Sequence, residues 1–429
     1  VAQTAGGVRV GVTGAAAGVF RWTEAEQALI AQSASIASDR KPAFARFADA
    51  GLPHRRVEAY HYTDLRALLK NAPPPAKAGG KIAIASPIAE IDAYILTLVD
   101  GHYVASSVAA PSGVTVKSVS TLADDGADEK GVLSPDPVIA LNAAFSENTL
   151  DVAIASKTEL AKPLVIRLVT TGAHASYPRV RMTIGDHAKV FLVESHEGGV
   201  SGSLIDSVFE LRLGDHVKID HLRLNLVDPS ATVLTTFGGA MGRESLYRGH
   251  NFVMGGALSR HQIFFRFEGE QSKADISSAS LLNKKQHADS TLVVDHAVPE
   301  CQSREFFAHV LDHESTGVFQ GKIIVRPGAQ QTDGKMMSRA IVLEDGATMN
   351  NKPELEIFAD DVACGHGATV GALDEDLLFY LRARGLPKTE AEALMLQAFV
   401  GEALEKIEHD ALRDTLESLA EAWLKARSA

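Results

Sequence analysis

Thiols are scarce in this sequence, because its 429 residues include only two cysteines, Cys301 and Cys364. Two cysteines cannot supply a disulfide framework or the paired CxxC motifs of a structural zinc site. So few thiols in so long a chain are typical of a reducing compartment, where we do not expect Cys301 and Cys364 to be bridged. Free cysteine is most often a small buried hydrophobe, and this is our interpretation of Cys301.

Long apolar runs and an excess of basic residues are also missing. No uninterrupted hydrophobic stretch approaches the roughly 20 residues of a bilayer span, and no leader of basic and then apolar residues is seen. The formal charge of -12 argues against nucleic acid and anionic membranes as partners, because both require basic surfaces. We therefore expect a soluble, cytoplasmic protein that binds neither nucleic acid nor membrane.

Several catalytic motifs are absent as well. The sequence has no Walker A loop and no hydrolase elbow, so we predict no P-loop nucleotide site. Val12 to Gly18 superficially resembles the first turn of a dinucleotide-binding fold, but the final glycine is missing and no strand-helix-strand unit follows. We expect no enzyme, while the sequence leaves open whether a flavin associates with the chain.

What the chain does contain is enough apolar material for a large core. Hydrophobic residues make up 45% and charged residues 22% of the sequence, which offsets the chain entropy that keeps polar sequences unfolded. We expect residues 1–20 to form a flexible extension, and residues 21–150 a helical region with short strands and a linker at the three prolines of residues 71–77. A β core over residues 151–373 and a helical domain over residues 374–429 complete the prediction.

The predicted β core contains an internal repeat. Short runs rich in Val, Ile, Leu and Phe alternate with Gly-Asp, Asp-Pro and Gly-Gly turns between Lys162 and Gly371. Within them, GDHAKVFLV from Gly185 is nearly repeated as GDHVKIDHL from Gly214. Such a repeat indicates coils stacked on one another, although the pattern alone leaves a sandwich or a barrel open.

The C-terminal region predicts helices with one apolar face. Asp374 can cap a helix that ends at Gly385, and Thr389 with Glu392 matches a capping box for the next helix. Steps of three and four then separate the members of one apolar stripe, which are Leu412, Leu416, Leu419 and Trp423. We expect this stripe to pack on the β core, with a partner surface as the alternative.

A cysteine and a histidine lie two residues apart in a strand-like stretch, residues 352–371, KPELEIFADDVACGHGATVG. Alternate residues of a strand point to one side about 7 Å apart, so we expect Cys364 and His366 to share a face. A thiolate and an imidazole can serve one iron, but clusters usually take four protein ligands, so another chain would have to complete such a site. The same spacing also fits two ordinary half-buried side chains.

The other histidines are weaker candidates. His309 and His313 have the i, i+4 spacing of a metal site on a helix, but their neighbours predict a strand, which holds the two rings too far apart. His187, His216 and His221 flank the turns of the repeat, where we expect exposed side chains without a ligand.

With its continuation LDEDLLFYLRARGLP, the stretch that contains Cys364 and His366 resembles the C-terminal motif of the SufD family, which are scaffold subunits of the SUF iron-sulfur cluster assembly system. Residues 318–325, VFQGKIIV, and residues 331–334, QTDG, support the resemblance. Residues 51–66, GLPHRRVEAYHYTDLR, are similar to the N-terminal motif of the family, except that Tyr60 stands where the motif has tryptophan. The resemblance covers most of the chain after about residue 45.

This resemblance implies a right-handed parallel β-helix between helical regions, and a non-catalytic scaffold. The scaffold would pair with a SufB homologue through the β-helix and would bind the SufC ATPase through its C-terminal helices. By motif, His366 would lie at the SufB interface as a metal ligand completed by the partner chain, whereas Cys364 matches the motif with packing as its alternative role. The cargo would be iron or a transient iron-sulfur cluster at the shared interface. Without its partners, the chain could form a homodimer through the same edge.

Two other hypotheses stay open. The first is a β-helical enzyme that acts on carbohydrate or acyl substrates in a long cleft, against which the aromatic content of 6% and the missing leader both count. The second is a SufB-type paralogue. Residues 366–371, HGATVG, resemble SufD rather than SufB, and the scarcity of cysteine agrees with this.

Overall fold

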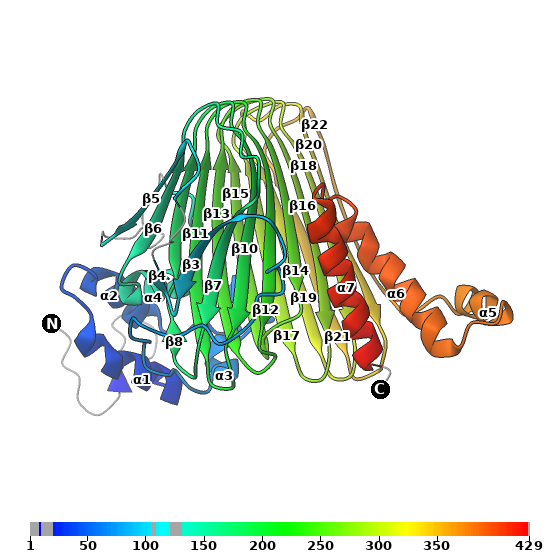
Figure 1. Cartoon of the computed structure of the whole chain (residues 1–429), viewed down its shortest axis with the longest axis horizontal. Helices are drawn as coiled ribbons and strands as arrows, with labels where there is room; N and C mark the ends of the chain where they lie inside the picture. Colours follow the sequence, from blue (N-terminus) through cyan, green and yellow to red (C-terminus); the bar gives the residue numbers. More distant parts are fainter. Residues whose placement is uncertain (1–7, 10–19, 105–108, 121–130, 428–429) are drawn as a thin grey trace.

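The computed structural model describes residues 8–9, 20–104, 109–120 and 131–427. Its centre is a parallel β-helix of two facing sheets, with helices outside the sheets (Figure 1). The predicted mainly β core between helical regions is therefore confirmed. The stretch from Val12 to Gly18 lies outside the described residues, as does most of the predicted extension.

Two ten-stranded sheets form the β-helix within the described ranges. The first sheet consists, in spatial order, of β22 (Val362–Gly371), β20 (Thr332–Val342), β18 (Gln302–Leu311), β16 (Lys273–Leu282), β14 (Leu246–Val253), β12 (Lys218–Val227), β10 (Lys189–Gly198), β7 (Leu164–Thr170), β3 (Tyr94–Val99) and β4 (His102–Val104). The second consists of β21 (Thr348–Ile357), β19 (Thr316–Val325), β17 (His287–His296), β15 (Leu258–Phe267), β13 (Thr232–Met241), β11 (Leu204–Leu213), β9 (Arg179–Ile184), β6 (Thr149–Ile154) and β5 (Val114–Val119), with β8 (Ala175–Ser176) beside β11.

The stacking of coils follows the internal repeat. The two repeat copies form β10 and β12, which pair in parallel with Lys189 opposite Lys218 and Gly198 opposite Val227. Strands alternate between the sheets along the chain, so each strand of the coils pairs with the strand two positions later in the sequence. Equivalent positions of successive coils therefore lie in columns, and the coil-by-coil prediction is confirmed.

One tight turn in each coil carries a residue other than glycine in the left-handed region. The φ angles of these residues lie between 52° and 62°, and the residues are Lys157, His187, His216, Glu244, Gln271, Glu300 and Gln331. Backbone N–H groups in these turns donate to carbonyls of the next coil, as from His187 to Asp215 and from Gln331 to Asp361. The left-handed conformation is unfavourable for most residues, and the hydrogen bonds to the next coil hold it in place.

His221 corrects one expectation. His187 and His216 do lie in turns, with their rings stacked 4.6 Å apart. His221 instead lies in β12 and is 3% exposed, with its Nδ1 atom 3.1 Å from the Tyr247 hydroxyl. The strand begins at Lys218, so residue 221 has the same inward parity as the buried Ile219, and the expected exposed position is wrong.

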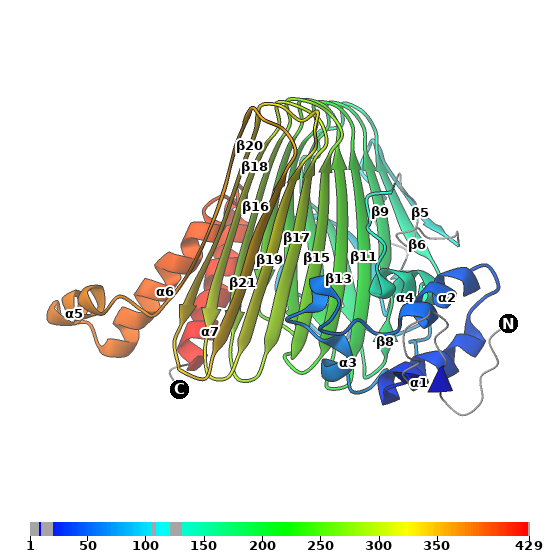
Figure 2. The same ribbon diagram turned by 180° about the vertical axis from the view of Figure 1, so that it is seen from behind.

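Helices lie against parts of the outer faces of the sheets, and Figure 2 shows the N-terminal helices over the lower part of the second sheet. The N-terminal helices contribute buried side chains to a cluster with Leu204, Leu234 and Leu258 of the second sheet. Their bounds are α1 (Glu24–Gln32), η1 (Ser33–Ser35), α2 (Lys41–Ala50), η2 (Glu58–Tyr60), α3 (Leu65–Leu68) and α4 (Pro137–Phe145). Ahead of them, β1 (Val8–Arg9) pairs with β2 (Phe20–Arg21). No helix among the described residues is both long and apolar enough to cross a membrane.

The last two C-terminal helices pack on the first sheet, whereas the one before them projects away from it (Figure 1). They are α5 (Glu375–Ala383), α6 (Lys388–Leu404) and α7 (Asp410–Arg427). The predicted stripe packs on this sheet, with Leu412, Leu416 and Trp423 buried and Leu419 partly buried. Asp374 caps α5 as expected, whereas the predicted capping box of Thr389 and Glu392 is wrong. Helix α6 begins two residues too early for it, because Pro387 takes the N-cap position.

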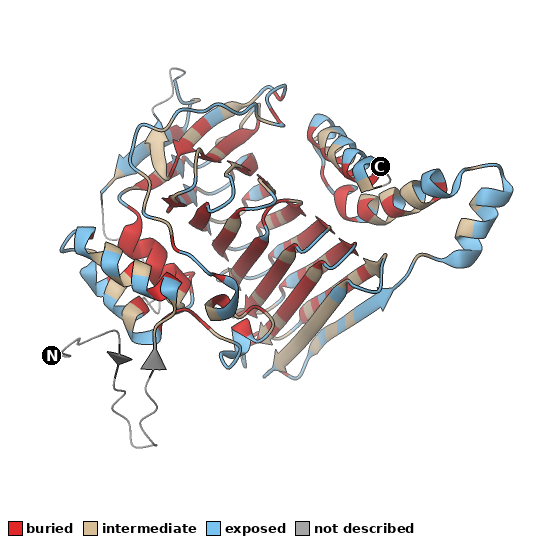
Figure 3. Ribbon diagram, turned by 90° about the horizontal axis from the view of Figure 1, so that it is seen from below, coloured by how far each residue is buried: buried red, intermediate tan, exposed pale blue. Residues whose placement is uncertain are grey.

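The two ends of the β-helix differ. At its N-terminal end, β4 and β5 pair antiparallel with β3 and β6, and a tight turn at Asp100 and Gly101 joins β3 to β4 in a hairpin. At its C-terminal end, β21 and β22 are the last strands of their sheets within the described residues, and neither contains a buried residue (Figure 3). We call β21 and β22 the open end.

Candidate functional site

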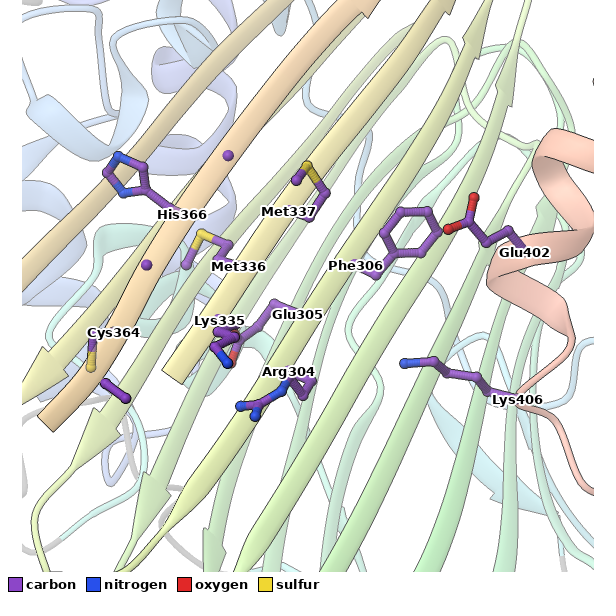
Figure 4. Close-up of a pocket in the computed structure, with 13 residues that line it drawn as sticks. Arg304, Glu305, Phe306, Lys335, Met336, Met337, Cys364, His366, Glu402 and Lys406 are labelled. Carbon is purple, nitrogen blue, oxygen red and sulfur yellow. The ribbon is translucent and has the colours of Figure 1, made fainter. Parts of the chain in front are cut away.

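Cys364 and His366 lie on β22, at the open end. The register with β20 places Cys364 opposite Gly334 and His366 opposite Met336. Both side chains therefore lie on the same face of the strand, and both project to the same side of β22 in Figure 4. Cys364 is partly buried against the apolar interior, and His366 is exposed. The expectation that the two residues share a face is confirmed.

The positions on either side of His366 in β22 are glycines and carry no side chain. Gly365 and Gly367 flank His366, and a side chain at Gly365 would meet nothing within 4 Å. Because these positions carry no side chain, a partner backbone can approach β22 closely from the outer face.

The Cys364 thiol is not activated in the isolated chain. Burial raises its pKa above the ordinary value, and the charges of Asp333 and Glu305 add to the increase, while the backbone at Gly334 opposes it. A thiol with a raised pKa is protonated at neutral pH and is a poor nucleophile. Metal or sulfur binding at Cys364 therefore requires a cation or a second chain that favours the thiolate.

A cavity of about 660 Å³ lies between α6 and the strands that end the first sheet (Figure 4). Its lining includes Cys364 and His366, together with Phe306 and Met337 as apolar groups. Charged side chains surround these groups and are mostly paired with one another. The pairs are Arg304 with Asp333, Lys406 with Asp275, and Arg339 with Glu402.

No complete metal site exists in the part of the chain that the structure describes. In those residues, no three His, Cys, Asp or Glu side chains are grouped closely enough to hold an ion. Cys364 and His366 are thus two groups that could contribute to a site but do not complete one. Tetrahedral iron sites and clusters usually require four protein ligands.

The remaining cysteine and two other histidines do not join this site. Cys301 is fully buried, burial raises its pKa to about 11, and it is not bonded to Cys364. His309 is buried in β18, where burial lowers its pKa to about 4, whereas His313 lies in a turn with a half-exposed side chain. The predicted strand holds His309, but it ends at Leu311, so His313 lies in the turn that follows.

The N-terminal motif, residues 51–66, packs across the outer face of the second sheet. The hydroxyl of Tyr60 donates to Asp136 at 2.9 Å, and the Arg260 guanidinium lies 4.0 Å from the centre of the Tyr60 ring. Glu58 pairs with Lys352 of β21 at 2.7 Å. Tyr60 stands where the motif has tryptophan, and its aromatic ring likewise offers a face to a buried arginine. Through the Glu58–Lys352 pair, the motif also connects the N-terminal region to the open end.

Sequence reasoning missed one residue that lines the same cavity, Glu305. It is 2% exposed on β18, and burial raises its pKa to about 8. The signal was present in the alternation of residues 303–307, SREFF, where a glutamate shares its parity with the buried Ser303 and Phe307. The sequence does not show which of the two alternating sets of residues faces the interior.

Helix α5 presents apolar side chains that the chain itself leaves uncovered. It has no buried residue, and Leu377, Phe379 and Tyr380 are 46%, 73% and 52% exposed. Exposed aromatic residues grouped on one short helix are typical of a protein-binding surface.

Comparisons with known proteins agree with this geometry. Residues 167–399 match the family described as SUF system FeS cluster assembly, SufBD core domain, and residues 20–166 match the SufBD protein N-terminal region. A SufBD family iron-sulfur cluster assembly protein of Synechocystis is 29% identical over 89% of this chain and 90% of its own length. Iron-sulfur cluster assembly protein SufD of Escherichia coli is 26% identical over 85% and 87%, and a SufBD family protein of Mycobacterium tuberculosis is 27% identical over 92% and 96%.

Proposed function

This chain belongs to the SufBD family of SUF-system iron-sulfur cluster assembly proteins, and from this premise we propose that it is a SufD-type scaffold subunit. It pairs with a SufB homologue at its open end and binds the SufC ATPase through its C-terminal helices. Iron or a nascent iron-sulfur cluster is the cargo held at the shared interface, and the chain itself catalyses no reaction.

The open end is the observation that carries the proposal. Its two strands contain no buried residue, and the last strand holds Cys364 and His366 on one face without enough ligands for a metal. Strands at the end of a sheet offer unpaired backbone groups to a partner strand, which supplies affinity by β-augmentation. A second scaffold chain at this position covers the open end and brings the missing ligands.

Within this proposal, His366 is the residue of this chain that ligates iron. It is the exposed member of the pair, so a partner chain can reach it. Imidazole suits iron, and a neutral ring can bind without losing a proton. Cys364 is more buried than His366 and has a raised pKa, so its protonated thiol favours a packing role as long as no cation is bound nearby.

Helix α5 is the surface that we assign to the ATPase. Its exposed Leu377, Phe379 and Tyr380 supply the aromatic and aliphatic anchors on which protein interfaces depend. Three residues connect the helix to β22, and it projects away from the β-helix in Figure 1, so its apolar side chains lie outside the strands of the open end.

Co-expression with SufB and SufC homologues tests the proposal. We expect a complex that carries iron and sulfide after anaerobic purification, and a His366→Ala complex that assembles but loses most of both. His313→Ala is the matched control, because this histidine is also exposed but lies in a turn away from the site. A stable complex whose cluster content is unchanged by His366→Ala would refute the role of His366.

Failure to form any complex would contradict the scaffold proposal as a whole. A chain that purifies alone with activity on carbohydrate or acyl substrates would favour the enzyme hypothesis. A symmetric pair of this chain in the absence of SufB would show that the same edge also forms a homodimer. The name of the E. coli relative favours the SufD type over the SufB type.

A further inference from the structure

Glu305 interrupts an apolar column inside the β-helix. Its neighbours at the same level are Ile276 on β16 and Met336 on β20, and Met336 in turn pairs with His366 on β22. Glu305 therefore lies two strands inward from His366, a separation of about 10 Å at the usual strand spacing. A carboxyl group at this position costs stability that an apolar side chain would not, so its presence calls for a function.

The Glu305 carboxyl group has no partner of its own. Neither oxygen accepts a hydrogen bond from any described residue. The nearby Ser303 hydroxyl lies 3.0 Å from Nε2 of His296, and Arg304 pairs with Asp333. Glu194, another carboxyl group of the interior, differs in this respect, because Nε2 of His196 lies 2.5 Å from one of its oxygens.

One position between the Glu305 strand and the open end lacks a side chain. Gly334 lies between Ser303 and Cys364 in the register, and an added Cβ there would come within 3.4 Å of the Ile323 side chain and of the Ser303 hydroxyl. Glu305 and Cys364 line the same cavity, and the charge of Glu305 acts on the Cys364 thiol. Figure 4 shows the Glu305 side chain directed from β18 toward β20 and β22.

We propose that Glu305 is the charge-compensating carboxyl of the open end: it holds a proton while the end is empty and releases it when a divalent cation such as Fe²⁺ binds at His366. This inference rests on the proposed function. Glu305 is a positioning residue here and does not contact the metal. The released proton leaves the carboxyl oxygen for solvent, and the carboxylate then offsets part of the charge of the bound cation.

The charges around Glu305 agree with this role. Burial is the largest influence on its ionisation. The nearby Ser303 side chain and then Arg304 favour the charged form, and Asp275 on β16 opposes it. Cys364 on β22 is the remaining titratable group that its charge reaches, while Ile276 and Met336 beside it carry no charge. A double positive charge about 10 Å away shifts such an ionisation equilibrium by roughly 10-fold or more.

Cobalt(II), a spectroscopic substitute for Fe²⁺, tests the inference on the complex with SufB and SufC homologues. The affinity for cobalt is measured for wild type and Glu305→Gln at pH 6.5 and pH 8.5. Binding that persists in His366→Ala is subtracted, so that only cobalt bound at His366 is counted. We expect equal affinities at pH 6.5, where both side chains are neutral, and a roughly 5- to 10-fold weaker affinity of Glu305→Gln at pH 8.5. The cobalt absorption bands should be the same in both, because Glu305 is not a ligand.

Glu402→Gln is the matched control, since Glu402 lines the same cavity from α6 and pairs with Arg339. We expect it to bind cobalt as wild type does at both pH values. An affinity ratio of wild type to Glu305→Gln that is the same at both pH values would overturn the inference, and so would altered absorption bands. Failure to form a complex would instead contradict the proposed function, so the two failures are distinguishable.

Discussion

The two ends of the β-helix show how one architecture can be closed at one end and left open at the other. At the N-terminal end, β4 and β5 turn back antiparallel, and α4 buries eight of its residues. At the C-terminal end, two full-length strands contain no buried residue. Stacked repeats need a cap at each end to cover their apolar faces. An end without one is the expected place for another chain.

Two buried carboxyl groups also differ, one within the stack of coils and one near the open end. Burial disfavours the charge of Glu194, but the hydrogen bond with His196 and the His221 ring 3.5 Å away hold its pKa well below the ordinary value. Glu305 lies near the open end without such partners, and burial raises its pKa to about 8. Glu194 and Glu305 thus differ in their partners, whereas Asp206 on β11, within the stack, resembles Glu305, because it is buried with both oxygens unpaired and burial raises its pKa.

The largest expected effect comes from removing the paired carboxyl group. Glu194→Ala leaves His196, His221 and Arg223 without their common partner, and breaking such a buried set costs about 3–5 kcal/mol. We expect a clear drop of the urea midpoint, measured by circular dichroism. Glu244→Ala is the control, because Glu244 is a half-exposed turn residue 3.5 Å from His216. Equal midpoints for the two variants would show that the interior network contributes no stability.

Replacing the unpaired carboxyl group should have the opposite sign. The folded-state pKa of Glu305 is about 8, above its ordinary value of 4.5, so wild type loses stability relative to Glu305→Gln as the pH rises through this window. Between pH 5 and pH 7.5 the loss is on the order of 3 kcal/mol. Urea midpoints of the isolated chain at the two pH values measure it. A difference between the variants that does not change with pH would contradict the raised pKa.

The smallest effect on stability is expected at the exposed helix. Phe379→Ala removes a side chain that is 73% exposed, so it should shift the free energy of unfolding by less than about 0.5 kcal/mol. The same variant should weaken binding of the SufC homologue, measured by calorimetry. Phe319→Ala, at a fully buried position of β19, is the contrasting variant and should cost about 3–5 kcal/mol. Unchanged SufC binding by Phe379→Ala would remove α5 from the proposed interface.

The sequence predicted much of the fold because repeats and alternation are local. The two GDH turns predicted that the β core consists of stacked coils. The alternation around Cys364 predicted that Cys364 and His366 share one face of a strand. His221 was misplaced because the turn motif does not reveal at which residue the strand begins. The capping box at Thr389 failed because Pro387 also fits a helix start.

The remaining features of the site depend on the stacking of distant strands. Alternation shows that Ser303, Glu305 and Phe307 share one side, but only the register across β16, β20 and β22 shows that this side faces the interior below His366. The exposure of β22 likewise follows from its position as the last strand of its sheet, which no property of residues 362–371 encodes.

The turns with left-handed residues bear on how this fold can change its length. Each turn is held by hydrogen bonds to the turn of the next coil, from Lys157 near the first coil to Gln331 near the last. Inserting or deleting a single residue would break this alignment and turn the inward side chains of a strand outward. A chain of this kind can grow or shrink only by whole coils, in steps of about 5 Å. The distance from the N-terminal helices to the open end is therefore a discrete quantity, set by the number of coils.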